Sequence, residues 1–456
     1  MENIRFKNLI QRCEEHSELF VTNLMVMKDD KIVFDFTKKP YQKGDLQFLF
    51  SVTKSFTSVA IGILADQGKL KIDDYITKYF EEETKDLTNP IIKKIQIKHL
   101  LMMAPGNESE APFSLQLQGN WVKVFFNQEF VHEPGSQFTY SSLTSHMLSE
   151  IVQRITGDTL ERFLKTHLFD KLGITNYQWE HFEGKTVGGV GLSLTPEDMM
   201  KFGKMLLHDG VYEGKRIVSK AYLDEATRVH IIKRWGGPVL ENEYTPYAGR
   251  QYGYQFHISP RSFRADGAFG QVIKVFKKEN MVVVANSQNT NYDVFWTIID
   301  KSLNIDEVKE DISKEELDQY LDSLTYENKQ FSEAKSPEFN GKYQLEPNVL
   351  EIDTFEFNEG ILTFNYTTGD KDLFDVSTQG SKYGMSYYKK KLILVNQKHY
   401  QEVYFEDNKL VLKILYIETP YVVHYIFERK NDSLTFEFIR NVSLYFNNFT
   451  QITTKI

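Results

Sequence analysis

The pattern of hydrophobic and polar positions at the start of the chain predicts a helix followed by a β-hairpin. Residues 3–17 have the spacing of a helix. Two β-prone runs follow, at 21–27 and 31–36, and the polar stretch Lys28-Asp29-Asp30 separates them. Such a pair of runs around a polar turn is typical of a hairpin.

Helices and loops dominate the chain from about residue 75 to 235, and one helix precedes them. Directly after Ser51 the apolar residues follow helical spacing, and Gly68 suits the end of that helix. Three further segments combine a turn with a helical pattern: 99–106, 132–157 and 194–210. Thr195 and Pro196 open the last of these, in the N-cap and first-turn positions that these residue types favour.

Strand patterns take over after the helical region. Three segments are rich in β-prone residues: 252–258, 271–278 and 281–288. A short polar turn at Glu279-Asn280 joins the last two, which predicts antiparallel neighbours. The amphipathic segment from Tyr292 to Leu303 predicts a helix that packs back on the sheet.

The pattern changes again in the last third of the chain. Residues 306–337 are charged and predict a helix and then a linker. Residues 338–456 consist of short alternating runs separated by turns, which predicts a small antiparallel β-barrel or sandwich, with a lipocalin-like barrel as one form. We therefore expect a larger domain over 1–305 and an all-β domain over 338–456. Its role stays open between a substrate lid, a ligand-binding barrel, a dimerisation module and a stabilising element.

The composition excludes several functional classes. The chain has 456 residues, enough for two domains, and a formal net charge of −9. A chain without a basic excess is a poor nucleic-acid binder, because phosphates need cations to neutralise them. No segment approaches the roughly 18 apolar residues of a membrane span, and the N-terminus lacks the apolar core of a secretory signal. We expect a cytoplasmic protein without a nucleic-acid partner or a membrane span.

Metal and cofactor chemistry find no support in the pattern of ligand residues. The chain has one cysteine, Cys13, so neither an intrachain disulfide nor a thiolate cluster can form. His99 and His132 are isolated, and no paired ligand spacing accompanies them. We predict that the protein uses no metal and no cofactor.

Ser51 and Lys54 are the first candidates for chemistry. They are three residues apart at the start of an apolar helix, so their side chains share one face. A serine hydroxyl needs a nearby base, and a lysine amine can serve when burial and the positive end of the helix lower its pKa. The backbone N–H of Ser51 can also face a developing oxyanion. The structural alternative is that Ser51 caps the helix and Lys54 is a surface cation.

Two other segments carry residues that complete such a site. Tyr140 begins the stretch Tyr140-Ser141-Ser142, and a tyrosine hydroxyl near a lysine can pass a proton between nucleophile and leaving group. Gly267 lies beside a predicted strand and allows close backbone approach, with Ala268 as the source of a second N–H. The structural alternatives are that Tyr140 packs in a core and that the small residues form a turn or bulge.

The order of these three elements resembles the serine β-lactamase and penicillin-binding-protein superfamily. The closest likeness is to the branch with class C β-lactamases, DD-peptidases, esterases and aminohexanoate-oligomer hydrolases. It covers about residues 10–305 and includes the segments GILADQGKLKIDDYI, EPGSQFTYSS, LFDKLGI and GGVGLSLTPEDMMKFG. It implies an α/β (α+β) fold in which helices flank an antiparallel sheet, with the site between the sheet and a helical lobe.

The resemblance implies a role for each candidate. Ser51 matches the acylated nucleophile, and Lys54 matches the base that takes its proton. Tyr140 matches the group that helps to protonate the leaving group and to deprotonate the hydrolytic water. The backbone amides of Ser51 and Ala268 match the oxyanion hole.

Two positions depart from the family pattern. Ser142 stands where many members have asparagine, and it offers one hydroxyl in place of an amide. Ala265 stands where a lysine or histidine helps to hold a substrate carboxylate, and the neighbouring Asp266 would repel one. Losing such a charge-assisted hydrogen bond costs about 1.5–3 kcal/mol, or roughly ten- to a hundredfold in binding. We therefore expect weak or absent β-lactamase and DD-peptidase activity.

Aromatic segments are the candidate walls of a substrate cleft. They are 120–126, which contains Trp121, and 243–254. Because aromatic residues make up 14% of the chain, packing is the stronger alternative for both segments. Gly267, Ser142 and Ala265 are the expected substrate contacts beside them.

The leading hypothesis is a metal-free serine hydrolase that cleaves a small-molecule ester, amide or short peptide through an acyl-enzyme at Ser51. The alternative is a noncatalytic binding or sensor protein on the same scaffold, which the changes at Ser142 and Ala265 motivate. A peptidase for D-amino-acid termini is a third hypothesis, and Ala265 disfavours it. The physiological substrate and the oligomeric state stay open.

Overall fold

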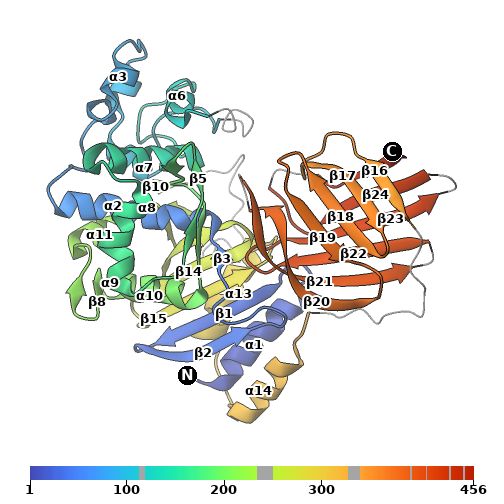
Figure 1. Cartoon of the computed structure of the whole chain (residues 1–456). Helices are drawn as coiled ribbons and strands as arrows, with labels where there is room; N and C mark the ends of the chain where they lie inside the picture. The colour runs from blue at the N-terminus through green and yellow to red at the C-terminus, as the bar shows by residue number, and fades with distance from the viewer. Residues whose placement is uncertain are drawn as a thin grey trace. The chain divides into compact units, whose positions relative to one another are not determined.

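The structure is a computed structural model that describes residues 1–111, 119–233, 250–326, 339–390, 393–406, 408–430, 433–444 and 447–456. These residues group into two compact units, residues 1–38 with 42–324 and residues 39–41 with 325–456. Figure 1 shows the helices and strands of both units. All of the candidate site residues lie in the first unit.

An eight-stranded antiparallel sheet forms the centre of the first unit. Its order is β10-β11-β12-β13-β14-β15-β1-β2. The strands are β1 (Val21–Lys28), β2 (Lys31–Thr37), β10 (Ile231–Ile232), β11 (Gln251–Tyr252), β12 (His257–Ile258), β13 (Phe263–Gly267), β14 (Gln271–Phe276) and β15 (Met281–Ser287). Because β1 pairs with β15, the predicted N-terminal hairpin joins the same sheet as the last strands of the unit.

Two helices cover one face of this sheet. They are α1 (Asn3–Glu14) and α13 (Tyr292–Asp300), near the two ends of the unit in the sequence. Phe6 of α1 and Trp296 of α13 lie in one buried cluster with Val283 of β15. The amphipathic pattern of both helices is therefore explained by a single shared core.

A third helix, α10 (Pro196–Leu207), packs on the opposite face of the sheet. Gly203 allows the close approach, because a Cβ atom there would lie 2.6 Å from Val282 Cγ1. The Thr195 side chain accepts a hydrogen bond from the Asp198 N–H, so the predicted N-cap is confirmed.

The predicted helix after Ser51 is α2 (Thr53–Asp66), and it packs on a helical lobe. In Figure 1, α7 (Ser142–Thr156) lies between α2 and the shorter helices α3 and α6. The shorter helices are α3 (Glu81–Thr84), α4 (Ile97–Leu101), α6 (Trp121–Phe126), α8 (Leu160–Leu164), α9 (Asp170–Leu172) and α11 (Lys220–Ala226). None of the helices in the described ranges is long and apolar enough to cross a membrane.

The segment 252–258 differs from the predicted secondary structure. The sequence predicts a single strand there, but β11 ends at Tyr252 and β12 begins at His257. Gln255 lies between them with a φ of +64°, and the two short strands pair antiparallel. The prediction was wrong because a tight turn can interrupt a β-prone run without any change in composition.

Several very short strands are also missing from the sequence-based prediction. They are β3 (Gln47–Phe48), β4 (Gln178–Trp179), β5 (His181–Phe182), β6 (Lys185–Thr186), β7 (Leu192–Leu194), β8 (Val211–Tyr212) and β9 (Lys215–Arg216). Two or three residues are too few for alternation to be recognised.

The charged segment 306–337 contains α14 (Lys314–Ser323), which confirms its predicted helix. The Ser313 side chain accepts a hydrogen bond from the Glu316 N–H at the start of this helix. Glu316 also forms an ion pair with Lys7 of α1, 2.9 Å long. Residues 327–337 of the expected linker lie outside the described residues.

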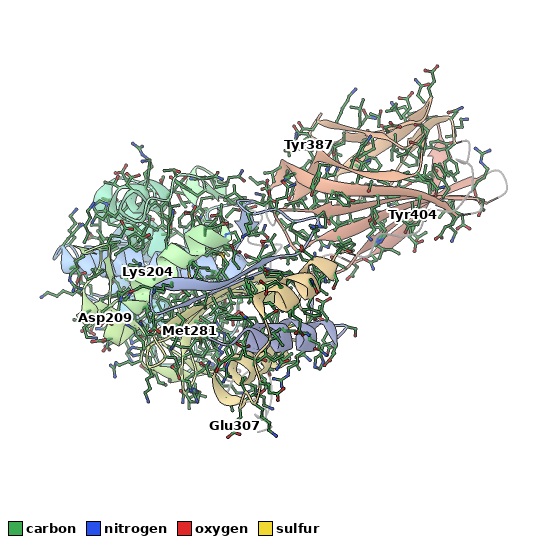
Figure 2. All side chains as sticks on the ribbon, turned by 90° about the horizontal axis from the view of Figure 1, so that it is seen from below. Lys204, Asp209, Met281, Glu307, Tyr387 and Tyr404 are labelled. Atoms are coloured by element: carbon green, nitrogen blue, oxygen red, sulfur yellow. The ribbon has the colours of Figure 1, made fainter. Side chains whose placement is uncertain are left out.

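The second unit is a near-closed barrel of ten antiparallel strands, so the predicted all-β architecture is confirmed. The order is β19-β18-β17-β16-β25-β24-β23-β22-β21-β20. The strands are β16 (Gly341–Gln344), β17 (Ile352–Asn358), β18 (Ile361–Tyr366), β19 (Lys371–Asp375), β20 (Gly380–Lys389), β21 (Leu394–Glu406), β22 (Lys409–Tyr416), β23 (Val422–Lys430), β24 (Ser433–Arg440) and β25 (Phe449–Lys455). Figure 2 labels Tyr387 on β20 and Tyr404 on the adjacent β21.

Aromatic rings occupy the described interior of the barrel. Tyr388 stacks on Tyr416 with ring centroids 4.4 Å apart, and the Arg440 guanidinium lies 4.6 Å from the Tyr421 ring centroid. The cavity beside Tyr366 and Arg440 measures about 10 Å³, which is close to the minimum for one water molecule. A barrel that holds a small ligand encloses a larger cavity, so these side chains leave no such room at this place.

Candidate active site

Ser51 lies in a tight turn that leads into α2. The 3-10 turn η1 (Phe50–Val52) separates β3 from the helix, and Ser51 is partly exposed. The N-cap residue of α2 is Val52, and the cap carries no side-chain hydrogen bond. Ser51 is therefore not the helix cap that the structural alternative required, and its hydroxyl can take part in other contacts.

Lys54 lies one turn further along and is almost completely buried, with 1% of its surface exposed. Its Nζ lies 3.0 Å from Ser51 Oγ and 3.2 Å from Ser142 Oγ. It also donates a hydrogen bond of 2.6 Å to the Gly189 carbonyl oxygen. Lys54 is thus not a surface cation, and its amine joins α2 to the start of α7.

Tyr140 completes the group of predicted residues around this amine. Its ring centroid lies 4.9 Å from Lys54 Nζ. The ring also packs on a small apolar cluster that contains Phe138 and Tyr252, so it has a packing contact as well as a place beside Lys54. The structure brings together Ser51, Lys54, Tyr140 and Ser142 from two distant parts of the sequence.

The first turn of α7 holds Ser142 in place. Ser141 is the N-cap, and its Oγ accepts a hydrogen bond from the Thr144 N–H. The Glu110 carboxylate accepts a 2.9 Å hydrogen bond from the Ser142 N–H. A carboxylate at this end of a helix is favourable because the helix dipole is positive there. Glu110 therefore fixes the residue whose hydroxyl contacts Lys54.

Gly189 and Glu110 are parts of the site that the sequence reasoning missed. The signal for Gly189 was the glycine pair Gly188-Gly189 in the family-like segment GGVG. A Cβ atom at Gly189 would lie 2.5 Å from the Ser142 carbonyl oxygen, so this close approach to α7 requires glycine. The carbonyl group itself carries no sequence signal, because every residue has one.

The end of β13 lies against the turn that carries Ser51. A Cβ atom at Gly267 would lie 2.3 Å from the Leu49 carbonyl oxygen and 3.3 Å from Val52 Cγ2. Gly267 thus permits the close backbone approach that the sequence predicted. Ala268 follows directly and is partly exposed, so its amide and that of Ser51 come from two segments in contact.

The residue that departs most from the family pattern is buried in the sheet. Ala265 is fully buried, which does not support the substrate contact expected of it. Asp266 accepts a 2.8 Å hydrogen bond from Arg264 Nε, and the Arg264 guanidinium lies 4.6 Å from the Trp296 ring centroid. The charges of Arg264 and Asp266 therefore pair with each other, and the Arg264 guanidinium also contacts α13.

Trp121 is a packing residue of the helical lobe. Only 6% of its surface is exposed. Its ring stacks on Phe182 with centroids 5.0 Å apart and meets His146 edge-on at 4.6 Å. This environment matches the structural alternative for Trp121 itself, and residues 243–249 of the other aromatic segment lie outside the described residues.

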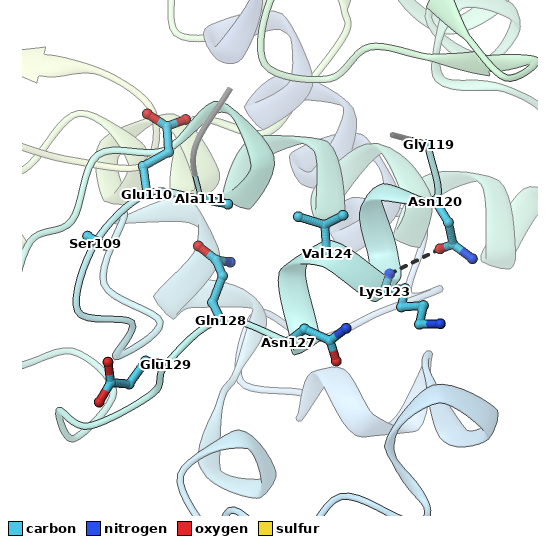
Figure 3. Close-up of a pocket in the computed structure, with 10 residues that line it drawn as sticks. All are labelled: Ser109, Glu110, Ala111, Gly119, Asn120, Lys123, Val124, Asn127, Gln128 and Glu129. Atoms are coloured by element: carbon cyan, nitrogen blue, oxygen red, sulfur yellow. Dashed lines mark hydrogen bonds between the residues drawn. The ribbon is translucent and has the colours of Figure 1, made fainter. Parts of the chain in front are cut away.

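A cavity of about 620 Å³ adjoins the residue that anchors Ser142 (Figure 3). Its described lining consists of Ser109, Glu110, Ala111, Gly119, Asn120, Lys123, Val124, Asn127, Gln128 and Glu129. Lys123 lies on its wall, and its N–H donates a hydrogen bond to the Asn120 side chain. Because Glu110 both lines the cavity and binds the Ser142 N–H, the cavity borders the candidate site.

A second buried amine, that of Lys233, lies near Tyr252 through His257. Burial and the nearby Arg264 charge lower the pKa of Lys233 to about 7. Its Nζ lies 2.8 Å from His257 Nδ1, and the His257 ring meets Tyr252 edge-on. Burial lowers the pKa of His257, and the charges of Lys233 and Lys54 act in the same direction.

Within the described residues, no group of three or more His, Cys, Asp or Glu side chains is arranged to hold a metal ion.

A model of the Beta-lactamase family matches residues 6–298, which is most of the first unit. This chain belongs to the Beta-lactamase family. The match confirms the resemblance inferred from the ordered motifs, and it includes all eight of the predicted site residues.

Curated members related to this Beta-lactamase family chain are distant in sequence. The 6-aminohexanoate-dimer hydrolase of Paenarthrobacter ureafaciens is 23% identical over 238 residues, which are 48% of this chain and 59% of that protein. The lovastatin esterase of Penicillium rubens is 25% identical over 197 residues, or 38% of this chain and 49% of the esterase. The chain spans about half the length of these relatives, whose names describe a hydrolase and an esterase.

Solved structures of the same fold align with the chain. A putative 6-aminohexanoate-dimer hydrolase from Bacillus anthracis has a TM-score of 0.52 at 20% identity, covering 67% of this chain and 83% of that one. The octameric penicillin-binding protein homologue from Pyrococcus abyssi has a TM-score of 0.52 at 16% identity, covering 99% of both chains. At these identities the likeness establishes the fold, and it confirms the predicted fold class.

Proposed function

We propose that the protein is a serine hydrolase that cleaves an ester or amide bond through an acyl-enzyme at Ser51. The observation that carries the proposal is the position of Lys54, a buried amine within hydrogen-bond reach of the Ser51 hydroxyl. A lysine side chain is rarely buried unless it is paired or used in chemistry. The proposed reaction needs only groups of this chain, one substrate and one water molecule.

The surroundings of Lys54 suit a neutral amine that acts as a base. A neutral amine has two N–H bonds and one lone pair. The Ser142 hydroxyl and the Gly189 carbonyl can accept the two N–H bonds. The lone pair then faces the Ser51 hydroxyl, which lies 3.0 Å away and can donate its proton.

In the first half of the reaction, Ser51 Oγ attacks the carbonyl carbon of the substrate while its proton passes to Lys54 Nζ. The carbonyl oxygen becomes negatively charged, and the amides of Ser51 and Ala268 are the proposed donors to it. The bond to the leaving group then breaks, and a proton returns to the leaving oxygen or nitrogen by way of Tyr140. The products are the acyl-enzyme and the free alcohol or amine.

In the second half, a water molecule attacks the acyl carbon and its proton passes to Lys54, either directly or by way of Tyr140, which gives its own phenol proton to Lys54 as it accepts the proton of the water. The proximity of the Tyr140 ring to Lys54 Nζ, 4.9 Å, supports a shared proton path. The ester bond to Ser51 breaks, Ser51 Oγ regains a proton, and the carboxylic acid leaves. The enzyme returns to its starting state.

The proposed substrates are neutral esters, amides or short peptides. The names of the relatives, a 6-aminohexanoate-dimer hydrolase and a lovastatin esterase, support amide and ester bonds as targets. Ala265 offers no cation for a substrate carboxylate and is buried. We therefore propose weak or absent turnover of β-lactams and of D-alanyl peptides, and a chromogenic cephalosporin is the direct test.

Release of the chromophore from a small aryl ester tests the proposal. The wild-type protein is expected to release it, and Ser51→Ala is expected to reduce the rate to the background. Ser55→Ala is the matched control, because Ser55 lies on the same helix and its hydroxyl donates to the Gln255 carbonyl instead. Equal rates in the wild type and in Ser51→Ala would contradict the proposal.

A noncatalytic binding protein on the same scaffold is the second candidate. The observation in its favour is the third-motif strand, where a buried Ala265 replaces the cation of catalytic relatives. Intact-mass measurement after treatment with an aryl phosphonate separates the two functions. A covalent adduct on Ser51 favours the hydrolase, and its absence favours the binding protein.

A further inference from the structure

Two phenylalanines with unusual backbone conformations flank the two proposed oxyanion amides. Phe50 directly precedes Ser51 and has a φ of +48°. Phe269 directly follows Ala268 and has a φ of +64°. Residues other than glycine rarely adopt this left-handed conformation, and bulky residues do so least, because the side chain then crowds the backbone. Such strain persists only where the surrounding structure holds it, and it is common at functional sites.

The two strained residues contact each other. Their rings meet edge to face, with centroids 5.4 Å apart and planes at 81°. Both side chains are buried, and Phe48 packs on Phe50 in the same edge-to-face manner at 4.7 Å. This geometry is the favourable one for aromatic pairs. The pair thus joins the turn before Ser51 to the turn after Ala268 through side chains.

Hydrogen bonds from the other side fix the Phe269 backbone. The Phe269 N–H donates to the Tyr292 hydroxyl at 2.9 Å, and the Asn289 N–H donates to the Phe269 carbonyl at 3.0 Å. The Ser287 hydroxyl lies 2.8 Å from the same carbonyl oxygen. Gly270 completes the turn, since a Cβ atom there would lie 2.2 Å from Ser287 Oγ. The turn is therefore held at both its N–H and its carbonyl group.

We infer that Phe50, Phe269 and Tyr292 are positioning residues that set the separation and direction of the Ser51 and Ala268 amides. The ring pair sets the distance between the two turns, and the Tyr292 hydroxyl sets the orientation of the peptide next to Ala268. An oxyanion hole works only when its donors lie about 2.7–3.1 Å from the oxygen that becomes charged. The inference rests on the proposed function, because it concerns the oxyanion hole of that reaction.

The variant Tyr292→Phe tests the hydroxyl with the smallest change. It keeps the ring and removes the acceptor of the Phe269 N–H. We expect kcat for an aryl ester to fall about tenfold with KM unchanged, because the hole acts on the transition state and not on the bound substrate. Tyr343→Phe is the matched control, since it removes a buried tyrosine hydroxyl that donates to the Phe339 carbonyl in the second unit.

The variant Phe269→Gly tests the ring. Glycine accepts the left-handed φ without strain, so the turn can persist while the contact with Phe50 is lost. We expect the affinity for phenylboronic acid, which forms a tetrahedral adduct with a serine hydroxyl, to fall by about the same factor as kcat. A purely structural role of Phe269 would instead lower the melting temperature and leave kcat per folded molecule unchanged.

Hydrogen exchange provides a readout that does not depend on activity. We expect the peptide that covers residues 263–271 to exchange faster in Tyr292→Phe and Phe269→Gly, and peptides of the second unit to remain unchanged. Unchanged exchange of that peptide in both variants would overturn the inference, whatever the activity. If the wild type is active and both variants exchange faster but keep the kcat of the wild type, the inference is overturned as well. If the wild type neither hydrolyses an aryl ester nor reacts with an aryl phosphonate, the proposed function fails, and the role in an oxyanion hole fails with it. If the wild type does react with the phosphonate, the proposed function stands, and the results for the variants test the role of the three residues alone.

Discussion

Lys274 and Lys54 are both buried in the first unit, but their amines meet different partners. Lys274 of β14 pairs with the carboxylate of Asp300 on α13. The contacts of Lys54 Nζ include two hydroxyls and one carbonyl oxygen. A carboxylate favours the charged form of a lysine, while uncharged oxygens also accommodate the neutral form. We therefore propose that Lys274 supports the fold, whereas Lys54 exchanges a proton in the proposed reaction.

The largest expected effect is that of Lys54→Met on catalysis. Removing the amine leaves Ser51 without its proposed base, and we expect kcat/KM for an aryl ester to fall by about a thousandfold or more. Steady-state rates and a melting curve measure this together. A variant that keeps most of its activity would show that Lys54, like Lys274, is a structural residue.

Lys274→Met is expected to act on stability instead. It leaves the Asp300 carboxylate buried without its partner, which costs about 3–5 kcal/mol of unfolding free energy. The double variant Lys274→Met with Asp300→Leu is expected to recover most of that loss, because an apolar pair replaces the ion pair. Urea unfolding measures both, and kcat of the folded variants is expected to match the wild type.

Gly267→Ala is expected to separate the two segments of the site. Its φ of −127° is open to any residue, so the cost is the steric contact of the new Cβ with the Leu49 carbonyl. We expect kcat/KM to fall by about tenfold to a hundredfold, since small displacements of catalytic groups have effects of this size. The control is Gly203→Ala, which crowds Val282 away from Ser51 and is expected to lower the melting temperature without changing kcat.

A further prediction concerns Lys233, a third buried amine. Its pKa of about 7 in the native state lies below the usual 10.5, so between these values the unfolded chain binds a proton that the native protein lacks. Stability therefore rises with pH across this window, and the full penalty is present below pH 7. Lys233→Met removes the penalty, so its gain in unfolding free energy is expected to be about 2–3 kcal/mol larger at pH 6 than at pH 9.

Urea unfolding at the two pH values measures this difference. A gain that is the same at pH 6 and pH 9 would show that the amine of Lys233 titrates normally, and that its burial does not set it apart from other lysines.

The candidate residues that lie at short, characteristic separations along the chain could be predicted from the sequence. Ser51 and Lys54 are one helical turn apart, and the stretch from Tyr140 to Ser142 directly precedes a clear amphipathic helix. Gly267 was predictable because close backbone approach favours glycine. Each of these signals is local, so the sequence alone was enough to recognise it.

The rest depends on contacts between distant segments. The Gly189 carbonyl is a backbone group without a side-chain identity, and Glu110 reaches Ser142 from a loop of no evident pattern. Trp121 and Ala265 were assigned to the substrate by residue type or by position in a motif, but both are buried. Burial is a property of the whole fold, and a short motif does not contain it.

The most direct test of the account is intact-mass and peptide mapping after treatment with an aryl phosphonate. The account predicts one covalent adduct per chain of the wild type, located on the peptide that contains Ser51. It also predicts no adduct in Ser51→Ala and a greatly slowed one in Lys54→Met. Labelling of wild type and Ser51→Ala to the same extent would contradict the claim that a hydroxyl beside the buried amine is the nucleophile.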